Sequence, residues 1–443
     1  MRYRYRTDEE MKDSGVEWIG KIPKDWIINK VKHVTYCEDG KRIPLSSEQR
    51  GKREGTIPYW GANSIIDYID DYLIDYEVVL LGEDGAPFFD KSKDVAFYSN
   101  EKIWPNNHVH ILKPKKRINA KFLVNSLNIV DFKNYIKGST RDKLTQSDMK
   151  EIFIQLPSNI REQEKIANFL DEKTSQFDLI ISKKEKLIER LEEAKKSLIS
   201  EVVTGKVKVV KTNNGYELVK RSSDEMKDSG VEWLGKIPND WKASKIKYEC
   251  SINARIGWKA LKADEYVEDG YIFLATPNIK GKYIDFKNVN YITKERYDES
   301  PEIKLEVNDV LLTKDGSTLG TVNVVRNLAK EATVNSSIAV IRSNKILNGV
   351  FLNYFIKSSY MQSIISMFKD GMGVPHLFQS DIKVFNILLP PYEEQLLISE
   401  CLDKKIDRID NMLGKVTIQI EKLKEAKQSL ISEAVTGKIE ILD

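Results

Sequence analysis

The feature that most constrains this chain is an internal repeat. The segment EAKKSLISEVVTGK, residues 193–206, returns as EAKQSLISEAVTGK, residues 425–438, with twelve of fourteen positions identical. MKDSGVEWIGKIPKDW begins at Met11 and MKDSGVEWLGKIPNDW at Met226, with fourteen of sixteen positions identical. Repetition at a long, fixed offset indicates that one structural unit occurs twice. We therefore expect a molecule with pseudo-two-fold internal symmetry.

The regions between these near-copies are related only faintly. VLLGEDG, which ends at Gly85, matches VLLTKDG, which ends at Gly316, and NxxVxI from Asn106 is similar to NxxIxV from Asn335. Both regions contain short β-rich runs bounded by Gly, Asp and Asn, and both end in QSDxK followed by LP. We expect two copies of one globular mixed α/β domain, so the fold class is α+β.

Each half ends in a long charged segment with the pattern of a coiled-coil helix. Apolar residues recur at alternating spacings of three and four, and Glu, Lys and Arg fill the other positions. The expected seam consists of Ile166, Leu170, Phe177, Ile180, Leu187, Leu191, Ala194 and Leu198 in the first segment and Leu402, Ile406, Ile409, Leu413, Val416, Ile420, Leu423 and Leu430 in the second. Gly205 and Gly437 are placed to cap the two helices at their C-terminal ends. Because each helix has a single apolar stripe, we expect the two to pair with each other, antiparallel, rather than to lie apart.

Composition excludes several classes of protein. No apolar run approaches 18 residues, so we expect no membrane span, and the N-terminal stretch lacks the apolar core of a secretory signal. Cys37, Cys250 and Cys401 lie far apart, which favours a reducing cytoplasm over a disulfide framework or a zinc site. The net charge of only +3 gives no direct indication of a nucleic-acid partner.

Catalytic signatures are missing from the sequence. It contains no GxxxxGK[ST] loop, no GxGxxG after a strand and no HExxH. LPPY, Leu389–Tyr392, is similar to the motif of amino-methyltransferases, but those enzymes need a polar acceptor where this chain has Leu389. His108 and His110 alternate in a strand-like run and are expected to share one face, whereas His33 and His376 are expected to be ordinary structural residues. We expect no catalysis, no cofactor and no metal in this chain.

Taken together, the motifs resemble the specificity subunit of type I restriction-modification systems. The resemblance rests on the SLISExVTGK tails, the junctions LPSNIREQEKI and LPPYEEQLLI, and the GVEWxGKIPxDW openings. IPYWGANSIIDYIDDYLIDYEVVLLGEDG, with WPNNHVHIL and GSTRDKL, resembles one class of target recognition domain, and VLLTKDGSTLG with NSSIAVI resembles another. Only the N-terminal head and the stretch 207–225 lie outside the resemblance.

The resemblance implies a domain order and a function. A first target recognition domain spans 1–157, a long helix 158–205, a linker 206–225, a second target recognition domain 226–390, and a second long helix with its tail 391–443. Each domain would read one half of a bipartite site in double-stranded DNA. The helices would dock two modification subunits that use S-adenosylmethionine to methylate adenine. Restriction subunits that use ATP and Mg would then join, so the cofactors belong to the partners.

The alternative that we keep open is a non-catalytic coiled-coil scaffold whose globular domains bind protein or glycan partners. The two hypotheses differ in the salt dependence that they predict. Only the hypothesis of DNA recognition predicts an affinity for duplex DNA that falls steeply as the salt concentration rises.

Residue types able to contact phosphates and bases, in polar loops beside the expected strands, give the candidate DNA-binding set. The set comprises Asn63, Ser64, Lys91, Asn106, Asn107, His108, Ser139, Thr140 and Arg141 in the first domain and Asn278, Lys280, Lys314, Ser317, Thr318, Asn335, Ser336 and Ser337 in the second. Four tryptophans recur between the halves, Trp18 with Trp233 and Trp26 with Trp241, and we expect these to be packing anchors.

Overall fold

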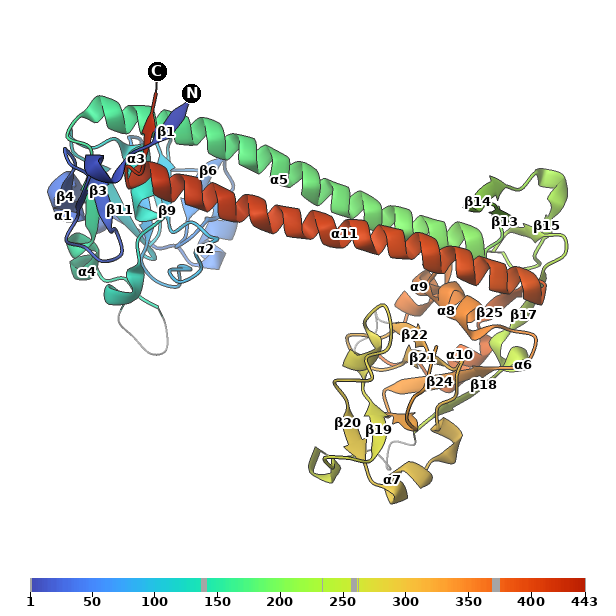
Figure 1. The fold of residues 1–443 in the computed structure, drawn as a ribbon. Helices are drawn as coiled ribbons and strands as arrows, with labels where there is room; N and C mark the ends of the chain where they lie inside the picture. Colours follow the sequence, from blue (N-terminus) through green and yellow to red (C-terminus); the bar gives the residue numbers. More distant parts are fainter. Residues whose placement is uncertain are drawn as a thin grey trace. The chain divides into compact units, whose positions relative to one another are not determined.

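The computed structural model describes residues 2–136, 142–232, 234–255, 261, 263–368 and 375–442 (Figure 1). It divides into two compact units: unit 1 combines Met1–Lys186 with Val416–Asp443, and unit 2 is Leu187–Lys415. The two long helices, α5 (Ile160–Val203) and α11 (Tyr392–Val435), each contribute residues to both units.

Two sheets form the globular part of unit 1. The four-stranded sheet has the antiparallel order β5 (Thr35–Cys37), β11 (Val109–Pro114), β8 (Val78–Gly82), β9 (Ala96–Ser99). The three-stranded sheet has the order β10 (Trp104–Pro105), β6 (Ile57–Trp60), β7 (Ile65–Ile69), with β10 parallel to β6. Helix α3 (Ala120–Leu127) packs on β8 and β9 and buries Phe122, Leu123 and Leu127.

Unit 2 repeats this topology strand for strand. Its four-stranded sheet has the order β18 (Cys250–Ala254), β24 (Ile338–Ser343), β21 (Val310–Thr313), β22 (Val322–Val324). Its three-stranded sheet has the order β20 (Asn290–Ile292), β19 (Tyr271–Leu274), β23 (Ala332–Val334), again with one parallel pair. Helix α8 (Gly349–Lys357) takes the place of α3. The expectation that the two variable regions share one mixed α/β fold is confirmed.

Smaller elements also recur in pairs. In unit 1 they are β2 (Met11–Asp13) with β3 (Lys21–Pro23), β4 (Ile27–Lys30) with β12 (Phe153–Leu156), α1 (Val31–Val34) and α4 (Gln146–Glu151). In unit 2 they are β15 (Met226–Asp228) with β16 (Lys236–Pro238), β17 (Lys242–Lys245) with β25 (Asn386–Leu389), α6 (Ile246–Glu249) and α10 (Gln379–Val384). Three short helices differ between the units: α2 (Ser47–Gly51), α7 (Lys294–Asp298) and α9 (Ser359–Ser366).

The stretch that sequence patterns leave outside the repeat is a copy of the two chain ends. Residues 206–225, expected to be a linker, contain a β-hairpin of β13 (Val207–Thr212) and β14 (Gly215–Lys220). In unit 1 the equivalent strands are β26 (Ile439–Ile441) and β1 (Tyr3–Tyr5), which pair antiparallel although they come from opposite ends of the sequence. Arg6 after β1 bonds Glu162 at 3.1 Å, and Arg221 after β14 bonds Glu394 at 2.5 Å.

Within each unit, the residues of α5 lie against those of α11 in antiparallel order. In unit 1, Asp178 pairs with Lys427 at 2.6 Å, and Lys184 donates to Gln419 at 2.7 Å. In unit 2, Lys195 pairs with Asp410 at 2.6 Å. As residue numbers rise along α5 they fall along α11, which confirms the expected antiparallel coiled coil.

The apolar stripe between the helices lies where the sequence predicts it in α11, but in part of α5 it lies one residue away from the predicted positions. Buried seam residues of α11 include Leu402, Ile406, Val416 and Ile420. In α5, however, Ile181 is 8% exposed, whereas the expected seam residues Ile180 and Leu187 are 43% and 42% exposed, and Ala194 is exposed as well. Ile180 and Leu187 are wrong by one residue, because each stands beside another apolar residue and periodicity alone does not choose between them. Ala194 is also wrong as a seam position.

The repeated sequence motifs contact each other, which explains why both are repeated. Gly205 has a φ of +74°, and the hydrogen bonds of Gly205 and the following amide close a Schellman cap. A Cβ on Gly205 would lie 2.5 Å from the ring of Pro238 and 3.2 Å from Trp241. Gly437, with a φ of +71°, makes the same close approach to Pro23 and Trp26. Each TGK tail therefore packs on an IPxDW block.

A tryptophan and a glutamine fix each globular domain to its helix. Trp26 and Trp241 are fully buried and donate to Glu162 at 3.3 Å and Glu394 at 2.9 Å, so their expected role as packing anchors is confirmed. Trp18 is half-buried, and Trp233 lies outside the described residues.

The glutamine makes the same three bonds in both units. Gln163 accepts from the amide of Asn119 at 2.9 Å and donates to two carbonyls, and Gln395 accepts from the amide of Asn348 at 2.8 Å and likewise donates to two carbonyls. A buried amide satisfied in this way costs little to bury and is specific in orientation.

Candidate nucleic-acid interface

Three loops meet at one edge of the four-stranded sheet in each unit. In unit 1 the loop after β8 bonds the segment before α4, with Gly85 donating to Asp142 at 3.1 Å and Leu144 donating to Glu83 at 2.8 Å. Glu83 also donates to the carbonyl of His108 at 2.9 Å, which attaches the loop before β11.

Unit 2 repeats all three bonds. Gly316 donates to Pro375 at 3.0 Å, Leu377 donates to Lys314 at 2.8 Å, and Lys314 donates to Ser337 at 2.8 Å. The backbone of this edge is thus the same in both units, while the side chains on it differ.

At the edge in unit 1, the three expected residues 106–108 have different surroundings. Asn107 is exposed, and His108 is half-exposed with its Nδ1 3.4 Å from Asp84. Asn106 is 5% exposed and its Oδ1 accepts from the amide of His108 at 2.7 Å, so its side chain shapes the turn. Asn107 and His108 are therefore the side chains that face outward here.

His110 lies beneath the edge and is fully buried, so it has no surface role in common with His108. Its Nδ1 is 2.7 Å from Asp39 and its Nε2 is 2.9 Å from the carbonyl of Leu144. Both neighbours offer acceptor oxygens, so each ring nitrogen of His110 lies within hydrogen-bond distance of a group that can accept from it. Burial opposes ionisation of Asp39, but hydrogen bonds to His110 and the amide of Ile111, together with the charges of His110 and Arg42, outweigh it and lower the pKa of that carboxyl to about 2.

The same cluster has ligand types that a metal could use. Ligand atoms of Asp39, Glu83 and His110 lie within 4.8 Å of one another. Arg42 already occupies the space between the carboxylates, because it forms ion pairs with Glu83 and, at 3.6 Å, with Asp39. We interpret the cluster as a hydrogen-bonded and ion-paired network that holds the loop edge in shape.

The edge in unit 2 borders a basic cavity. This cavity, about 380 Å³, is lined by Arg255, Lys314, His376 and Gln379 among others. Lys314 pairs with Asp315 at 2.8 Å, and His376 pairs with the same carboxylate.

Arg255 is 3% exposed, and neither Nη atom has a hydrogen-bond partner among the described residues. Its closest carboxylate contact is with Glu299 at 4.0 Å. Burial, followed by repulsion from Arg296, lowers the pKa of Arg255. Sequence reasoning missed this arginine, because a single basic residue inside a β-rich run carries no pattern.

The remaining expected residues divide between this edge and other places. Ser317 and Thr318 follow Lys314 on the edge, and Asn335, Ser336 and Ser337 are half-exposed beside it. Asn63 and Ser64 are exposed in the turn between β6 and β7. Ser139, Thr140 and Arg141 lie outside the described residues, directly before the segment that bonds Glu83 and Gly85.

Three of the expected residues are placed elsewhere. Asn278 is 9% exposed and its amide holds a turn, accepting from Ala275 at 2.8 Å and donating to Asn288 at 2.7 Å. Lys91 and Lys280 are exposed and line cavities beside the long helices. Lys143, 3.5 Å from Glu83, was missed by sequence reasoning although it lies at the loop edge.

The fold and the two loop edges define a protein with two copies of one recognition domain on a helical frame. Comparison with known families places it directly: the chain belongs to the type I restriction modification DNA specificity domain family, whose model matches residues 23–192 and 238–422. The two matched ranges correspond to the two halves, and the resemblance seen in the sequence motifs is confirmed.

Curated relatives and solved structures agree with this family. The chain is 24% identical over 432 residues to the type I restriction enzyme MjaVIII specificity subunit of Methanocaldococcus jannaschii, covering 95% of this chain and 94% of the relative. It is 33% identical over 165 residues to a putative type I specificity subunit, S.HindORF215P, of Haemophilus influenzae, covering 37% of this chain and 39% of the relative.

The fold matches a chain from a structure that addresses complex assembly and conformational transition of the type I R-M system. The TM-score is 0.67 at 14% identity, over 94% of this chain and 99% of the other. Within the part of the chain that the structure describes, no helix is both long and apolar enough to cross a membrane.

Proposed function

We propose that each recognition domain reads one half of a bipartite site in double-stranded DNA through its loop edge. The observation that carries the proposal is that two identical backbone frames present different side chains. Asn107 and His108 in unit 1 correspond to Ser336 and Ser337 in unit 2. Unlike donors and acceptors at equivalent places are what two different half-sites require.

Charge at the two edges supports the same proposal. In unit 2, Lys314 lies where unit 1 has Glu83, and the buried Arg255 lines the same cavity as Lys314. Lysine and arginine bind phosphates and guanine edges, whereas carboxylates accept from cytosine. The two domains are therefore suited to unlike base sequences.

We further propose that the chain works in a complex and does not itself catalyse a reaction. Two modification subunits that bind S-adenosylmethionine and methylate adenine at N6 would dock on the long helices. Restriction subunits with ATP and Mg would complete an endonuclease. The complex would act in the cytoplasm, where the DNA is.

Mapping of methylated adenines in strains with and without this gene tests the proposal. We expect one bipartite motif to lose methylation when the gene is absent. Exchange of residues 27–155 for the corresponding region of another family member should change one half of the motif and preserve the other. An unchanged methylation pattern, together with no salt-dependent binding of duplex DNA by the assembled complex, would favour a scaffold that binds protein or glycan partners.

The loop edge can be tested more narrowly by transplantation. Replacing Asn107 and His108 by Ser-Ser, the pair found in unit 2, should relax or change only the half-site read by unit 1. Lys52→Ala is a matched control, because Lys52 is an exposed residue directly after α2 that forms an ion pair with its neighbour Glu48. If the control altered the half-site and the transplant did not, the loop edge would not be the reading surface.

The paired helices can be tested as the element that sets the spacer between half-sites. Four residues add about 6 Å of helix, and they would be inserted into 183–190 of α5 and, to preserve pairing, into the facing part of α11. We expect a different spacer with both half-sites unchanged.

A further inference from the structure

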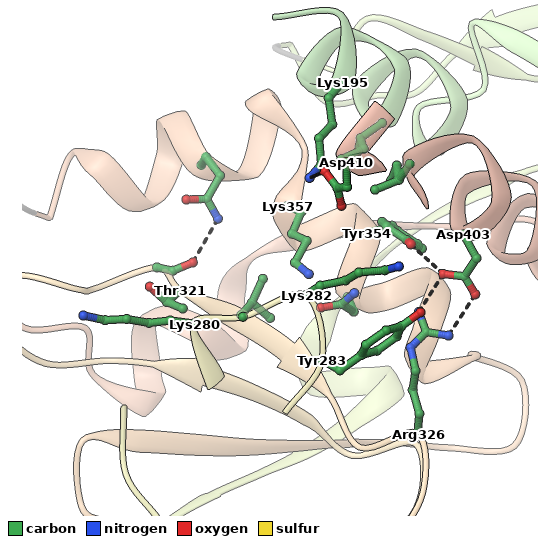
Figure 2. A pocket seen from close by; sticks show the side chains of 17 residues that line it. Lys195, Lys280, Lys282, Tyr283, Thr321, Arg326, Tyr354, Lys357, Asp403 and Asp410 are labelled. Atoms are coloured by element: carbon green, nitrogen blue, oxygen red, sulfur yellow. Dashed lines mark hydrogen bonds and ion pairs between the residues drawn. The ribbon is translucent and has the colours of Figure 1, made fainter. Parts of the chain in front are cut away.

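Unit 2 contains a cavity in which positive charge exceeds negative charge. It has a volume of about 390 Å³ and lies among residues of α5, α8, α11 and the segment around Lys280 (Figure 2). Its charged lining consists of Lys195, Lys280, Lys282, Arg326, Lys357, Asp403 and Asp410. Five cationic side chains therefore face two carboxylates.

The two carboxylates are already engaged. Arg326 forms a two-pronged pair with Asp403 at 2.8 and 2.7 Å, and the hydroxyl of Tyr354 donates to Asp403 at 2.6 Å. Lys195 pairs with Asp410 at 2.6 Å. Each carboxylate therefore already forms an ion pair with one cation of the lining.

Lys282 finds its partner outside the cavity lining, in Asp407 at 2.5 Å. Two cations, Lys280 and Lys357, make no ion pair with any described residue. The unbalanced charge at the cavity is therefore two.

Of the two unpaired lysines, Lys357 gives the stronger indication of a bound anion, because it is less exposed than Lys280. It ends α8, and Figure 2 shows its side chain reaching into the cavity, with Lys195 and Asp410 on one side and Lys282 on the other. Burial, followed by repulsion from Lys195 and Arg326, lowers the pKa of Lys357 to about 8. Lys357 is half-buried, and an ammonium group in such a place without an ion-pair partner is unfavourable unless another group neutralises it.

A neutral polar group in the wall also lacks a partner. Asn353 is 2% exposed and lines the cavity, and its Oδ1 has no hydrogen-bond partner among the residues that the structure describes. The oxygen and nitrogen of an amide are assigned from the surrounding hydrogen bonds, so the group can turn its NH₂ toward a bound acceptor. Asn353 and Lys357 lie one helical turn apart on α8 and serve the same cavity.

Unit 1 shows that the fold does not need this lysine. Asn119 and Asn348 cap α3 and α8 in the same way, and counting from these caps places Asn128 where unit 2 has Lys357. The Oδ1 of Asn128 accepts from the amides of Val95 at 2.9 Å and Ala96 at 2.8 Å. The cavity beside Asn128, about 880 Å³, is lined by six carboxylates and five lysines.

We propose that the cavity of unit 2 binds a phosphate group, with Lys357 and Lys280 neutralising its two charges and Asn353 donating to a phosphate oxygen. Phosphate suits the site because several donors converge on it from different directions and charge-assisted bonds are strong. The volume admits a ligand as large as a small phosphorylated molecule. The group comes from a free phosphate compound or from a DNA backbone, and the proposal does not depend on the base reading proposed above.

The test is thermal unfolding of the full chain in inorganic phosphate and in pyrophosphate, against chloride at equal ionic strength. Hydrogen exchange assigns the transition to unit 2. We expect phosphate to raise the unfolding midpoint of unit 2 and not that of unit 1. Lys357→Met should abolish at least nine-tenths of the affinity for phosphate, while its midpoint without phosphate should be higher than that of the unsubstituted protein, because an unpaired charge has been removed.

Lys404→Met is the matched control. Lys404 is an exposed lysine on α11 that does not line the cavity, and its replacement should leave the phosphate response intact. A midpoint that is the same in phosphate and chloride, or a Lys357→Met protein that responds like the unsubstituted one, would overturn the proposal.

Duplex DNA separates the two sources of phosphate. If the group belongs to a DNA backbone, Lys357→Met lowers DNA affinity and reduces the salt slope by about one. If it belongs to a free compound, DNA affinity and salt slope are unchanged while the phosphate response is lost. Either result supports the proposal that the cavity of unit 2 binds a phosphate group. Complete absence of DNA binding in every variant would contradict the proposed base reading and leave the phosphate response as a separate measurement.

Discussion

The two units are attached to the long helices by the same contacts but differ in the cavity beside that attachment. Trp26 and Trp241 are both fully buried, and Gln163 and Gln395 make matching bonds. A few residues away, unit 1 has Asn128 in a satisfied network where unit 2 has the unpaired Lys357. The shared contacts are those on which the helical frame depends, whereas residues that face a cavity or solvent have diverged in type and charge.

The anchoring tryptophans give the largest expected effect. Trp26→Ala and Trp241→Ala should each destabilise their own unit by about 3–5 kcal/mol, because a fully buried indole is lost together with its bond to a glutamate. Hydrogen exchange in denaturant can locate the loss in one unit. If either substitution weakened both units equally, the two attachments would not be independent.

Substitution of the capping glycines gives the next largest expected loss of stability. Gly205→Ala and Gly437→Ala should each cost about 2–3 kcal/mol, because alanine is strained at positive φ and its Cβ would overlap a proline ring. Gly215→Ala is the matched control: its φ is +129° but no atom lies within 4 Å of the added Cβ. A control as destabilising as the other two would show that the close approach to proline is unimportant.

Because of Lys357, we expect the stability of unit 2 to depend on pH differently from that of unit 1. The folded pKa of Lys357, about 8, lies below the ordinary value of 10.5, so the unfolded chain binds more protons between these values and stability rises with pH there. Unit 2 should therefore gain about 1–2 kcal/mol between pH 8 and pH 10.5 relative to Lys357→Met, a figure reduced for partial exposure.

The charged groups that act on Lys357 are Lys195, Arg326, Asp403 and Asp410, and Lys282 lies on its other side (Figure 2). The comparison with Lys357→Met removes the pH dependence that the two proteins share, so the remaining gain belongs to Lys357 itself. Unfolding measured at several pH values checks it, and equal curves for the two proteins would mean that the ammonium is well solvated.

The smallest effect is expected at the equivalent ion pairs between the helices. Lys427→Ala should destabilise unit 1 by about 0.5 kcal/mol, and less at high salt, because Asp178 is largely exposed. Lys195→Ala should cost even less in unit 2, because Lys195 also repels Lys357. Unfolding at low and high salt compares the two, and a larger loss for Lys195→Ala would argue against repulsion at the cavity.

Much of the fold was predictable because short sequence patterns indicate its elements. The seam of α11, the glycine caps and the shared strand pattern of the variable regions each depend on residues close in sequence. The seam of α5 was wrong by one position at Ile180 and Leu187, where several apolar residues stand together. The match of the 207–220 hairpin with the chain ends was hidden, because its strands have few identities and come from distant parts of the chain.

The site was less predictable than the fold. Loops after strands were rightly chosen as the places where polar residues gather, yet asparagine serves turns as well as ligands. Asn106 and Asn278 proved to be buried in turns, and composition does not separate these roles. Arg255, His110 and Lys357 depend on which distant residues surround them, so no local pattern marks them.

The pairing of β1 with β26 has a consequence for synthesis of the protein. Unit 2 is one continuous stretch of chain, but unit 1 needs Met1–Lys186 and also Val416–Asp443, which are synthesised after the whole of unit 2. The usual order, in which the earlier domain folds first, is therefore reversed. A product that ends at a premature stop directly before Val416 would contain a complete unit 2. Its unit 1 would lack β26 and the part of α11 that belongs to it.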